Sequence, residues 1–186
     1  MSTYWPITEA KRTVFRATDD AVKERVRQCV RFLQRVRHIE RDSRSPSDDK
    51  HALRLRVSLE DGDDDRAGFT IDRTMDEIKQ LHRMVVYWSS KHDTLHASYG
   101  VPPCEFCAQF NTKAARNAWP HGLKKLLLST DARDELLQRR LNELVHQATL
   151  FETLVQRQDV RCDGMEHVPS VVVTFLLKDV DQSALS

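Results

Sequence analysis

Glycine is scarce in this chain, with five in 186 residues, and no glycine-rich phosphate-binding motif occurs. The sequence contains no P-loop, no GxGxxG dinucleotide fingerprint and no GxSxG elbow of the kind found in hydrolases. Histidines and carboxylates are scattered without a spacing that indicates acid–base catalysis. We therefore expect a protein that is not an enzyme and that carries no cofactor.

Long apolar runs are also missing. No stretch approaches the ~20 apolar residues that a helix needs to cross a bilayer. The first residues, MSTYWPITEAKR, lack the apolar core of a secretory signal. We expect a cytoplasmic protein in which the four cysteines (Cys29, Cys104, Cys107 and Cys162) are reduced thiols and not a disulfide framework.

The net charge is only +1, but the charges are segregated along the chain. Six arginines lie close together in sequence: Arg25, Arg27, Arg31, Arg35, Arg37 and Arg41. Five acids follow further on: Glu60, Asp61, Asp63, Asp64 and Asp65. This pattern fits either a basic functional surface or ordinary solvated faces. Phe32 is the only aromatic residue within the basic run, so base stacking has little support and we expect no nucleic-acid partner.

Hydrophobic periodicity predicts a sheet of three short strands. Residues 51–60 alternate apolar and polar side chains, and Phe69–Arg73 continues this spacing. Residues 26–39 fit two structures, an irregular strand with a bulge near Leu33 or an amphipathic helix. The pieces indicate an α+β fold in which a three-stranded antiparallel sheet is covered on one face by helices.

Helical spacing follows the sheet. A helix is expected from about Met75 to Ser89, and a long connection from His92 to Pro120 includes a possible short helix over 107–118. A second long helix should start at an N-cap at Asp131 and run to about Gln156. The valines and threonine of residues 171–174 favour a strand by propensity.

Three stretches, in this order, resemble elements of the phox-homology (PX) domain. Ile78-Lys-Gln-Leu-His82 is similar to the Phe-x-x-Leu-His of that family, and it follows a strand that ends near Arg73. Residues 133–145 (RDELLQRRLNELV) are similar to the PX helix Arg-x-x-x-Leu-x-x-aromatic-Leu-x-x-Leu. Residues 167–176 (HVPSVVVTFL) resemble the closing motif, which in PX domains is a short helix. The resemblance implies a PX-like domain over residues 25–180, an N-terminal extension over 1–24 and a C-terminal tail over 181–186.

The resemblance implies a three-stranded sheet packed on a helical subdomain, with a basic pocket for a phosphoinositide headgroup between them. The corresponding candidate ligands are Arg73, Lys124, Lys125 and Arg133. A loop with Pro102, Pro103 and Phe106 would enter the membrane. The expected partner is then a phosphoinositide-containing membrane, with peripheral recruitment to endosomal membranes, and protein partners are also possible.

The chain departs from the family pattern at the first candidate ligand. With Ile78 in the position of the family's Phe, Thr74 and Met75 stand where PX domains place Arg and Tyr. Arg73 lies one residue early, so it points to the other face of a regular strand unless a bulge restores it. The orientation of Arg73 therefore distinguishes a lipid-binding module from a degenerate PX-like fold that serves as a protein–protein interaction scaffold.

Cys104-Glu-Phe-Cys107 forms a CxxC motif. Two thiolates at this spacing can bind zinc or form a redox pair. A structural zinc site needs four ligands, and His92, His96 and His121 are the nearby candidates for the others. The flanking aromatic residues instead favour a short buried helix with packed thiols.

Overall fold

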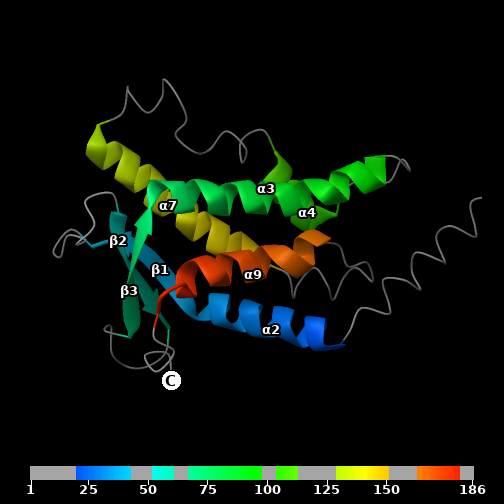
Figure 1. Cartoon of the computed structure of the whole chain (residues 1–186), viewed down its shortest axis with the longest axis horizontal. Coiled ribbons are helices and arrows are strands. Elements are labelled where there is room, and N and C mark those ends of the chain that lie inside the picture. Colours follow the sequence, from blue (N-terminus) through cyan, green and yellow to red (C-terminus); the bar gives the residue numbers. More distant parts are fainter. Residues whose placement is uncertain are drawn as a thin grey trace, which may run out of the picture.

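The computed structural model describes residues 20–42, 52–60, 67–97, 104–112, 129–150 and 163–180. The described part is an α+β fold in which one small sheet packs against helices (Figure 1). Its elements in chain order are α2 (Asp20–Arg35), β1 (Val36–Arg41), β2 (Ala52–Leu59), β3 (Gly68–Thr74), α3 (Met75–Ala97), α4 (Glu105–Asn111), α7 (Thr130–Thr149) and α9 (Asp163–Leu177).

The sheet is an antiparallel meander with the strand order β1-β2-β3. Leu55 of β2 lies opposite Arg41 of β1 on one side and Ile71 of β3 on the other. The register between β1 and β2 shifts between Val36 and His38, whereas β2 and β3 pair in step from Ala52 to Ser58. This sheet and its helices confirm the predicted fold class.

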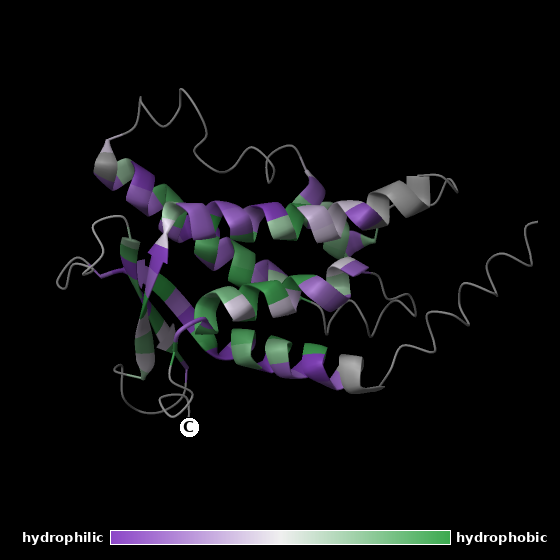
Figure 2. Ribbon diagram, viewed as in Figure 1, coloured by the Kyte–Doolittle hydropathy of each residue, from purple (hydrophilic) through white to green (hydrophobic). Residues whose placement is uncertain are grey.

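Three helices form a layer beside the sheet. Figure 1 shows α9 lying between α3 and α2, and the contacts of α9 with both helices agree with that view. Helix α7 contacts α2, β1 and α9. Apolar side chains gather where the elements face one another (Figure 2), and the largest fully buried ones include Phe106, Leu33, Ile39, Leu55 and Ile78.

Residues 26–39 adopt both of the structures that the sequence allowed, one after the other. They are helical to Arg35 and then enter strand β1 at Val36. Val26, Val30 and Leu33 form the buried stripe of α2, which is helical spacing. Because α2 begins at Asp20, regular structure also reaches into residues 1–24, which we expected to be an extension.

Several helix boundaries differ from the predictions. Helix α3 continues to Ala97, beyond the predicted end near Ser89. The short helix α4 spans Glu105–Asn111 and begins two residues before the predicted helix over 107–118, of which residues 113–118 lie outside the described ranges. Ser129 is the N-cap of α7 in place of Asp131, since its hydroxyl accepts a hydrogen bond from the backbone of Ala132 at 3.2 Å. The same helix ends at Thr149.

The last element, α9, is a helix although its valines and threonine favour a strand. The PX resemblance predicted this helix, and the structure confirms it. Buried side chains recur at Met165, Val168, Val172, Phe175 and Leu176, which is the three- and four-residue spacing of one helix face. Burial of this face against neighbouring helices outweighs the weaker local propensity.

Candidate functional site

Arg73 lies on the buried face of β3. Phe69, Ile71 and Arg73 alternate with more exposed residues along the strand, and the Arg73 side chain is 2% exposed. The regular pairing of β2 with β3 leaves Arg73 on the face opposite its neighbour Thr74. No bulge in β3 turns the guanidinium to the other face.

The guanidinium of Arg73 binds the carboxyl end of α9. Its Nε donates to the carbonyl of Phe175 at 2.8 Å, and one Nη donates to the carbonyl of Lys178 at 2.5 Å. The other Nη donates to the carbonyl of Asp72 at 2.7 Å. The carbonyls of Phe175 and Lys178 lie in and just after the last turn of α9, where helix carbonyls lack intrahelical donors and a cation is favourable.

Electrostatics keep this buried arginine charged. Desolvation lowers the pKa of Arg73, while the carboxylates of Glu77 and Asp179 oppose that shift. The guanidinium also lies 5.5 Å from the centre of the Phe175 ring. This geometry gives no support to the expectation that Arg73 is a headgroup ligand, because each of its three guanidinium nitrogens already donates to a carbonyl within the fold.

Thr74 and Glu77 form a reciprocal cap at the start of α3. The Thr74 hydroxyl accepts from the backbone N–H of Glu77 at 3.2 Å, and a carboxylate oxygen of Glu77 accepts from the N–H of Thr74 at 2.8 Å. The other carboxylate oxygen is 2.5 Å from Nζ of Lys178. The ammonium of Lys178 and the bonds from Thr74 lower the pKa of Glu77 to about 2. A fixed negative charge therefore lies beside the position where PX domains carry an arginine.

Arg133 lies in the first turn of α7, away from Arg73. Its backbone N–H donates to the carbonyl of Ser129 at 3.1 Å, and its half-buried side chain takes part in interactions within the chain. Figure 1 shows the start of α7 well apart from the end of α9, to which Arg73 is bonded. The structure therefore does not bring these two predicted ligands together. Lys124 and Lys125 lie outside the described residues.

Helix α4 carries the only described residue of the predicted membrane-inserting loop. Phe106 is fully buried, and its ring centre lies 5.2 Å from that of Phe110. This burial gives no support to the expectation that Phe106 enters a membrane, since an inserting ring must be exposed at the surface. Pro102 and Pro103 lie outside the described residues.

The CxxC thiols lie at the start of α4. Cys104 is the N-cap, and its sulfur accepts a hydrogen bond from the backbone N–H of Cys107 at 3.4 Å. Within the described ranges, no group of three or more His, Cys, Asp or Glu side chains is placed to hold a metal ion. The described part of the chain therefore gives no support to the zinc alternative, and the side chains of His92, His96 and His121 lie outside it.

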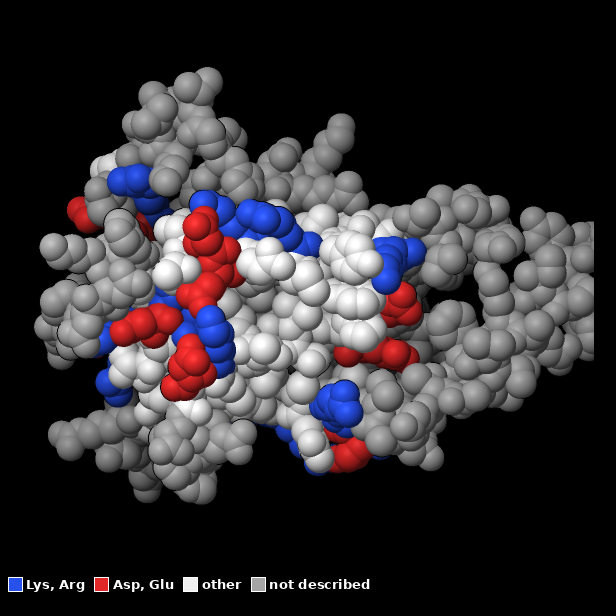
Figure 3. Space-filling view, in the orientation of Figure 1, with Lys and Arg blue, Asp and Glu red and all other residues white. Residues whose placement is uncertain are grey.

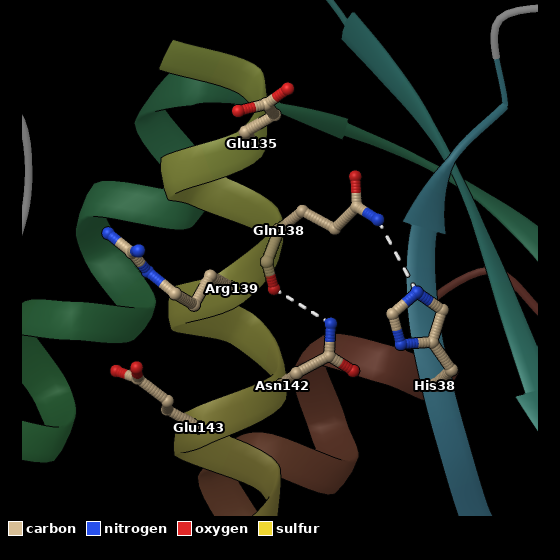
Figure 4. A pocket seen from close by; sticks show the side chains of 6 residues that line it. All are labelled: His38, Glu135, Gln138, Arg139, Asn142 and Glu143. Carbon is tan, nitrogen blue, oxygen red and sulfur yellow. Dashed lines mark hydrogen bonds between the residues drawn. The ribbon is translucent and has the colours of Figure 1, made fainter. Parts of the chain in front are cut away.

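A shallow groove between β1 and α7 has a volume of about 370 Å³. It is lined by His38, Glu135, Gln138, Arg139, Asn142 and Glu143. Figure 4 shows that Arg139 and Glu143 point away from His38, so no set of like charges converges there. Periodicity did not reveal this groove, because its residues come from the exposed sides of both elements.

The main contact in the groove is structural. The Asn142 amide accepts from the backbone N–H of Ile39 at 2.8 Å and donates to the carbonyl of Ile39 at 2.8 Å. One side chain thus satisfies both polar groups of a residue on the outer edge of β1. The groove resembles a strand edge closed by a helix more than a ligand pocket.

An aromatic patch, formed by Tyr87, Trp88, Lys91 and His167, lies on α3 and α9. Tyr87 is 50% exposed, and the rings of Trp88 and His167 stack with their centres 3.7 Å apart. Nζ of Lys91 lies 4.7 Å from the Tyr87 ring centre and 4.3 Å from that of Trp88. Figure 3 shows uncharged surface over α9, bordered by charged side chains, with Lys and Arg side chains along α3.

The spacing of residues in α3 could have indicated the aromatic patch. Ile78, Leu81 and Val85 define the buried stripe of α3. Tyr87 lies two residues beyond Val85, which is about 200° around the helix and therefore outside that stripe. A large aromatic residue at such a position is a candidate for surface contact.

Comparison of the chain with models of known protein families, with curated proteins and with solved structures finds no match in any of the three. Among the described helices, none combines the length and the apolar character that crossing a membrane requires.

Proposed function

We propose that this chain is a PX-like module that binds a protein partner and does not hold a phosphoinositide headgroup in the manner of the family. The observation that carries this proposal is the burial of Arg73 against the carboxyl end of α9. A phosphate ligand needs a guanidinium whose donors are available. The donors of Arg73 instead satisfy three backbone carbonyls.

Rearrangement of Arg73 toward a ligand would be expensive. Buried carbonyls left without a donor cost about 1–3 kcal/mol each. The ionised carboxylate of Glu77, beside the same strand end, would also repel an incoming phosphate. Both effects oppose a headgroup at this site.

The aromatic patch is the surface that best fits a protein partner. Tyr and Trp are enriched among the residues that dominate binding energy in protein interfaces. Tyr87 is the one large apolar side chain that is exposed among the residues described here. Uncharged surface over α9 lies beside the patch (Figure 3), so a partner that covers it would desolvate few charges besides that of Lys91.

Liposome flotation across a panel of phosphoinositides tests the first half of this proposal. We expect no headgroup-selective binding by the full chain, and we expect the Arg133→Ala variant to behave as the unmodified protein does. Selective flotation that Arg133→Ala abolishes would overturn the proposal. Circular dichroism of both proteins shows that folding is intact.

Site-specific photocrosslinking tests the second half. A photoreactive amino acid at position 87 should give a discrete adduct in the protein's own cells, whereas one at Gln80, also exposed on α3, should not. Trp88→Ala in the position-87 protein should remove the adduct, because the ring that supports the patch is lost. Equal crosslinking at both positions would contradict an interface centred on the patch.

A second candidate, electrostatic binding to phosphoinositide-rich endosomal membranes, is favoured by the outer face of α2. Arg25, Arg27 and Arg31 are exposed there. Glu24 lies near two of them, 3.7 Å from Arg27 and 3.8 Å from Arg31. Such a surface would attract anionic lipid without a shaped pocket.

A further inference from the structure

We propose that Cys104 and Cys107 form a reversible disulfide with a low-molecular-weight disulfide as the oxidant. Cys29, Cys104 and Cys107 are all thiols in the structure. Cys104 and Cys107 differ from Cys29 because they are neighbours at the N-cap and first turn of the same helix, α4. The inference is independent of the proposed partner binding.

The backbone places the two cysteines close together, at the N-cap and in the first turn of α4. Residues three apart in a helical turn have Cβ atoms about 5–6 Å apart, near the range from which a disulfide closes with small rotations. Cys104 is at the extended N-cap, with φ −65° and ψ 153°, and its sulfur lies 3.4 Å from the backbone nitrogen of Cys107. The first sulfur thus lies over the residue that carries the second.

The two thiols differ in access, which sets the order of the reaction. Cys104 is 9% exposed and Cys107 is fully buried. The Cys104 thiolate attacks one sulfur of the oxidant and releases one thiolate, which gives a mixed disulfide. The Cys107 thiolate then attacks the Cys104 sulfur and releases the second thiolate. Two protein thiols are oxidised to a disulfide, and the two released thiolates take up the two protons, so that the external disulfide is reduced to two thiols.

Closure of this disulfide changes the contact between α4 and α9. A Cβ atom at Gly164 of α9 would lie 2.5 Å from the sulfur of Cys107, so that sulfur fills the space that a side chain would occupy. The same Cβ would lie 3.5 Å from Cα of Ser89 and 3.6 Å from the carbonyl oxygen of Trp88. When the Cys107 sulfur turns toward Cys104, it leaves this junction and opens a void.

The other end of α4 stays attached during this change. The amide of Asn111 donates to the carbonyl of Ser89 at 2.9 Å, and the Ser89 hydroxyl lies 3.2 Å from the amide oxygen of Asn111. Oxidation therefore loosens the packing at the start of a short helix whose end remains bonded to α3. The reduced protein is the better packed state.

Titration of the full chain with mixtures of oxidised and reduced glutathione tests the proposal. After acid quenching and proteolysis, mass spectrometry should show a peptide that contains both Cys104 and Cys107 and has lost two hydrogen atoms. Cys104→Ser and Cys107→Ser should each abolish this species. A stable glutathione adduct on Cys104 alone, a bond to Cys29 or Cys162, or no oxidation would overturn the proposal.

Gly164→Ala tests the coupling to α9. The added Cβ displaces the Cys107 sulfur toward Cys104, so the disulfide should form at an oxidant ratio about tenfold lower than in the unmodified protein. An unchanged or higher ratio would contradict the coupling. If this variant does not fold, the unmodified protein still tests the coupling, because its oxidised form should melt at a lower temperature than its reduced form. An oxidised form that melts at an equal or higher temperature would exclude the void.

Discussion

At the scale of single residues, Arg73 contributes to the stability of the fold, and its burial removes it from the predicted headgroup pocket. Its side chain connects a strand to a helix end that is more than a hundred residues further along the chain. Arg73→Met keeps most of the length and apolar stem but removes every donor. We expect a loss of about 2–4 kcal/mol in the free energy of unfolding, measured by chemical denaturation, because buried carbonyls lose their partners.

Arg83→Met is the matched control for this variant. Arg83 is exposed on α3, and surface substitutions usually change stability by no more than ~0.5 kcal/mol. Similar values for both variants would mean that the bonds from Arg73 to α9 contribute little in solution.

Glu77 should make stability depend on pH at the acid end. Its pKa is lowered from 4.5 to about 2, first by the hydrogen bond from Lys178 and then by that from Thr74. A carboxyl with a lowered pKa stabilises the fold above its unfolded value, and this stabilisation is lost as pH falls from about 4.5 toward 2. Because the side chain is 29% exposed, solvent screening reduces the effect to about 1 kcal/mol.

Comparison with Glu77→Gln isolates this contribution. The variant should be less stable than the unmodified protein at neutral pH, and the difference should shrink between pH 4.5 and 2. Urea denaturation at several pH values measures it. A difference that stays constant across this window would show that the carboxyl does not titrate with the fold.

The sequence predicts which face of β3 carries the Arg73 side chain. Phe69, Ile71 and Arg73 share one parity along the strand, and that parity predicts the same face for all three. The sequence could not predict the partners of Arg73, because these partners are backbone carbonyls, which every residue type carries. Sequence reasoning could therefore place this side chain inside but could not state what it binds.

At the scale of secondary-structure elements, α4 is held by its aromatic side chains. Phe106→Ala should destabilise the protein by about 3–5 kcal/mol, because a fully buried ring is replaced by a cavity. Thermal and chemical denaturation of the purified variant measure this loss. Tyr87→Ala, at a half-exposed ring, should cost far less. If Phe106→Ala were as stable as Tyr87→Ala, the ring would have to be at the surface in solution.

Asn142 should protect the outer edge of β1. Asn142→Ala removes both hydrogen bonds to Ile39 and should cost about 1–3 kcal/mol. An edge strand with unsatisfied polar groups also invites pairing with other chains, so the variant should self-associate at high concentration. Light scattering checks this outcome. The Gln138→Ala variant, changed at the same groove, should self-associate no more than the unmodified protein does.

Element types were predicted better than their limits. The alternation in β2 and the buried stripes of α3 and α7 follow from period alone. The change from α2 to β1 between Arg35 and Val36 did not, because Val26, Val30 and Val36 share one strand parity and also belong to the helical series Val26, Val30, Leu33 and Val36. Helix α9 required the family resemblance, since its packing partners are distant in sequence.

At the scale of the whole molecule, the charged outer face belongs to α2, whereas the aromatic patch belongs to α3 and α9 (Figure 1). Replacement of Arg25, Arg27 and Arg31 by Gln should remove any binding to anionic vesicles at low salt. The unmodified protein should lose the same binding as ionic strength rises, since the Debye length falls to about 8 Å at 0.15 M. Crosslinking at the aromatic patch should be unaffected. Vesicle binding that is unaffected by both the arginine replacements and the rise in ionic strength would mean that the lipid contact lies elsewhere.

The bonds from Arg73 to α9 also determine when the chain can finish folding during its synthesis. The three strands and Arg73 leave the ribosome first, whereas the carbonyl of Lys178 is made 105 residues later. At about 5–20 residues per second, this delay is about 5–20 s. Throughout that interval the meander holds a charged side chain on the face that will become its interior. The nascent sheet therefore cannot reach its final burial before α9 is made.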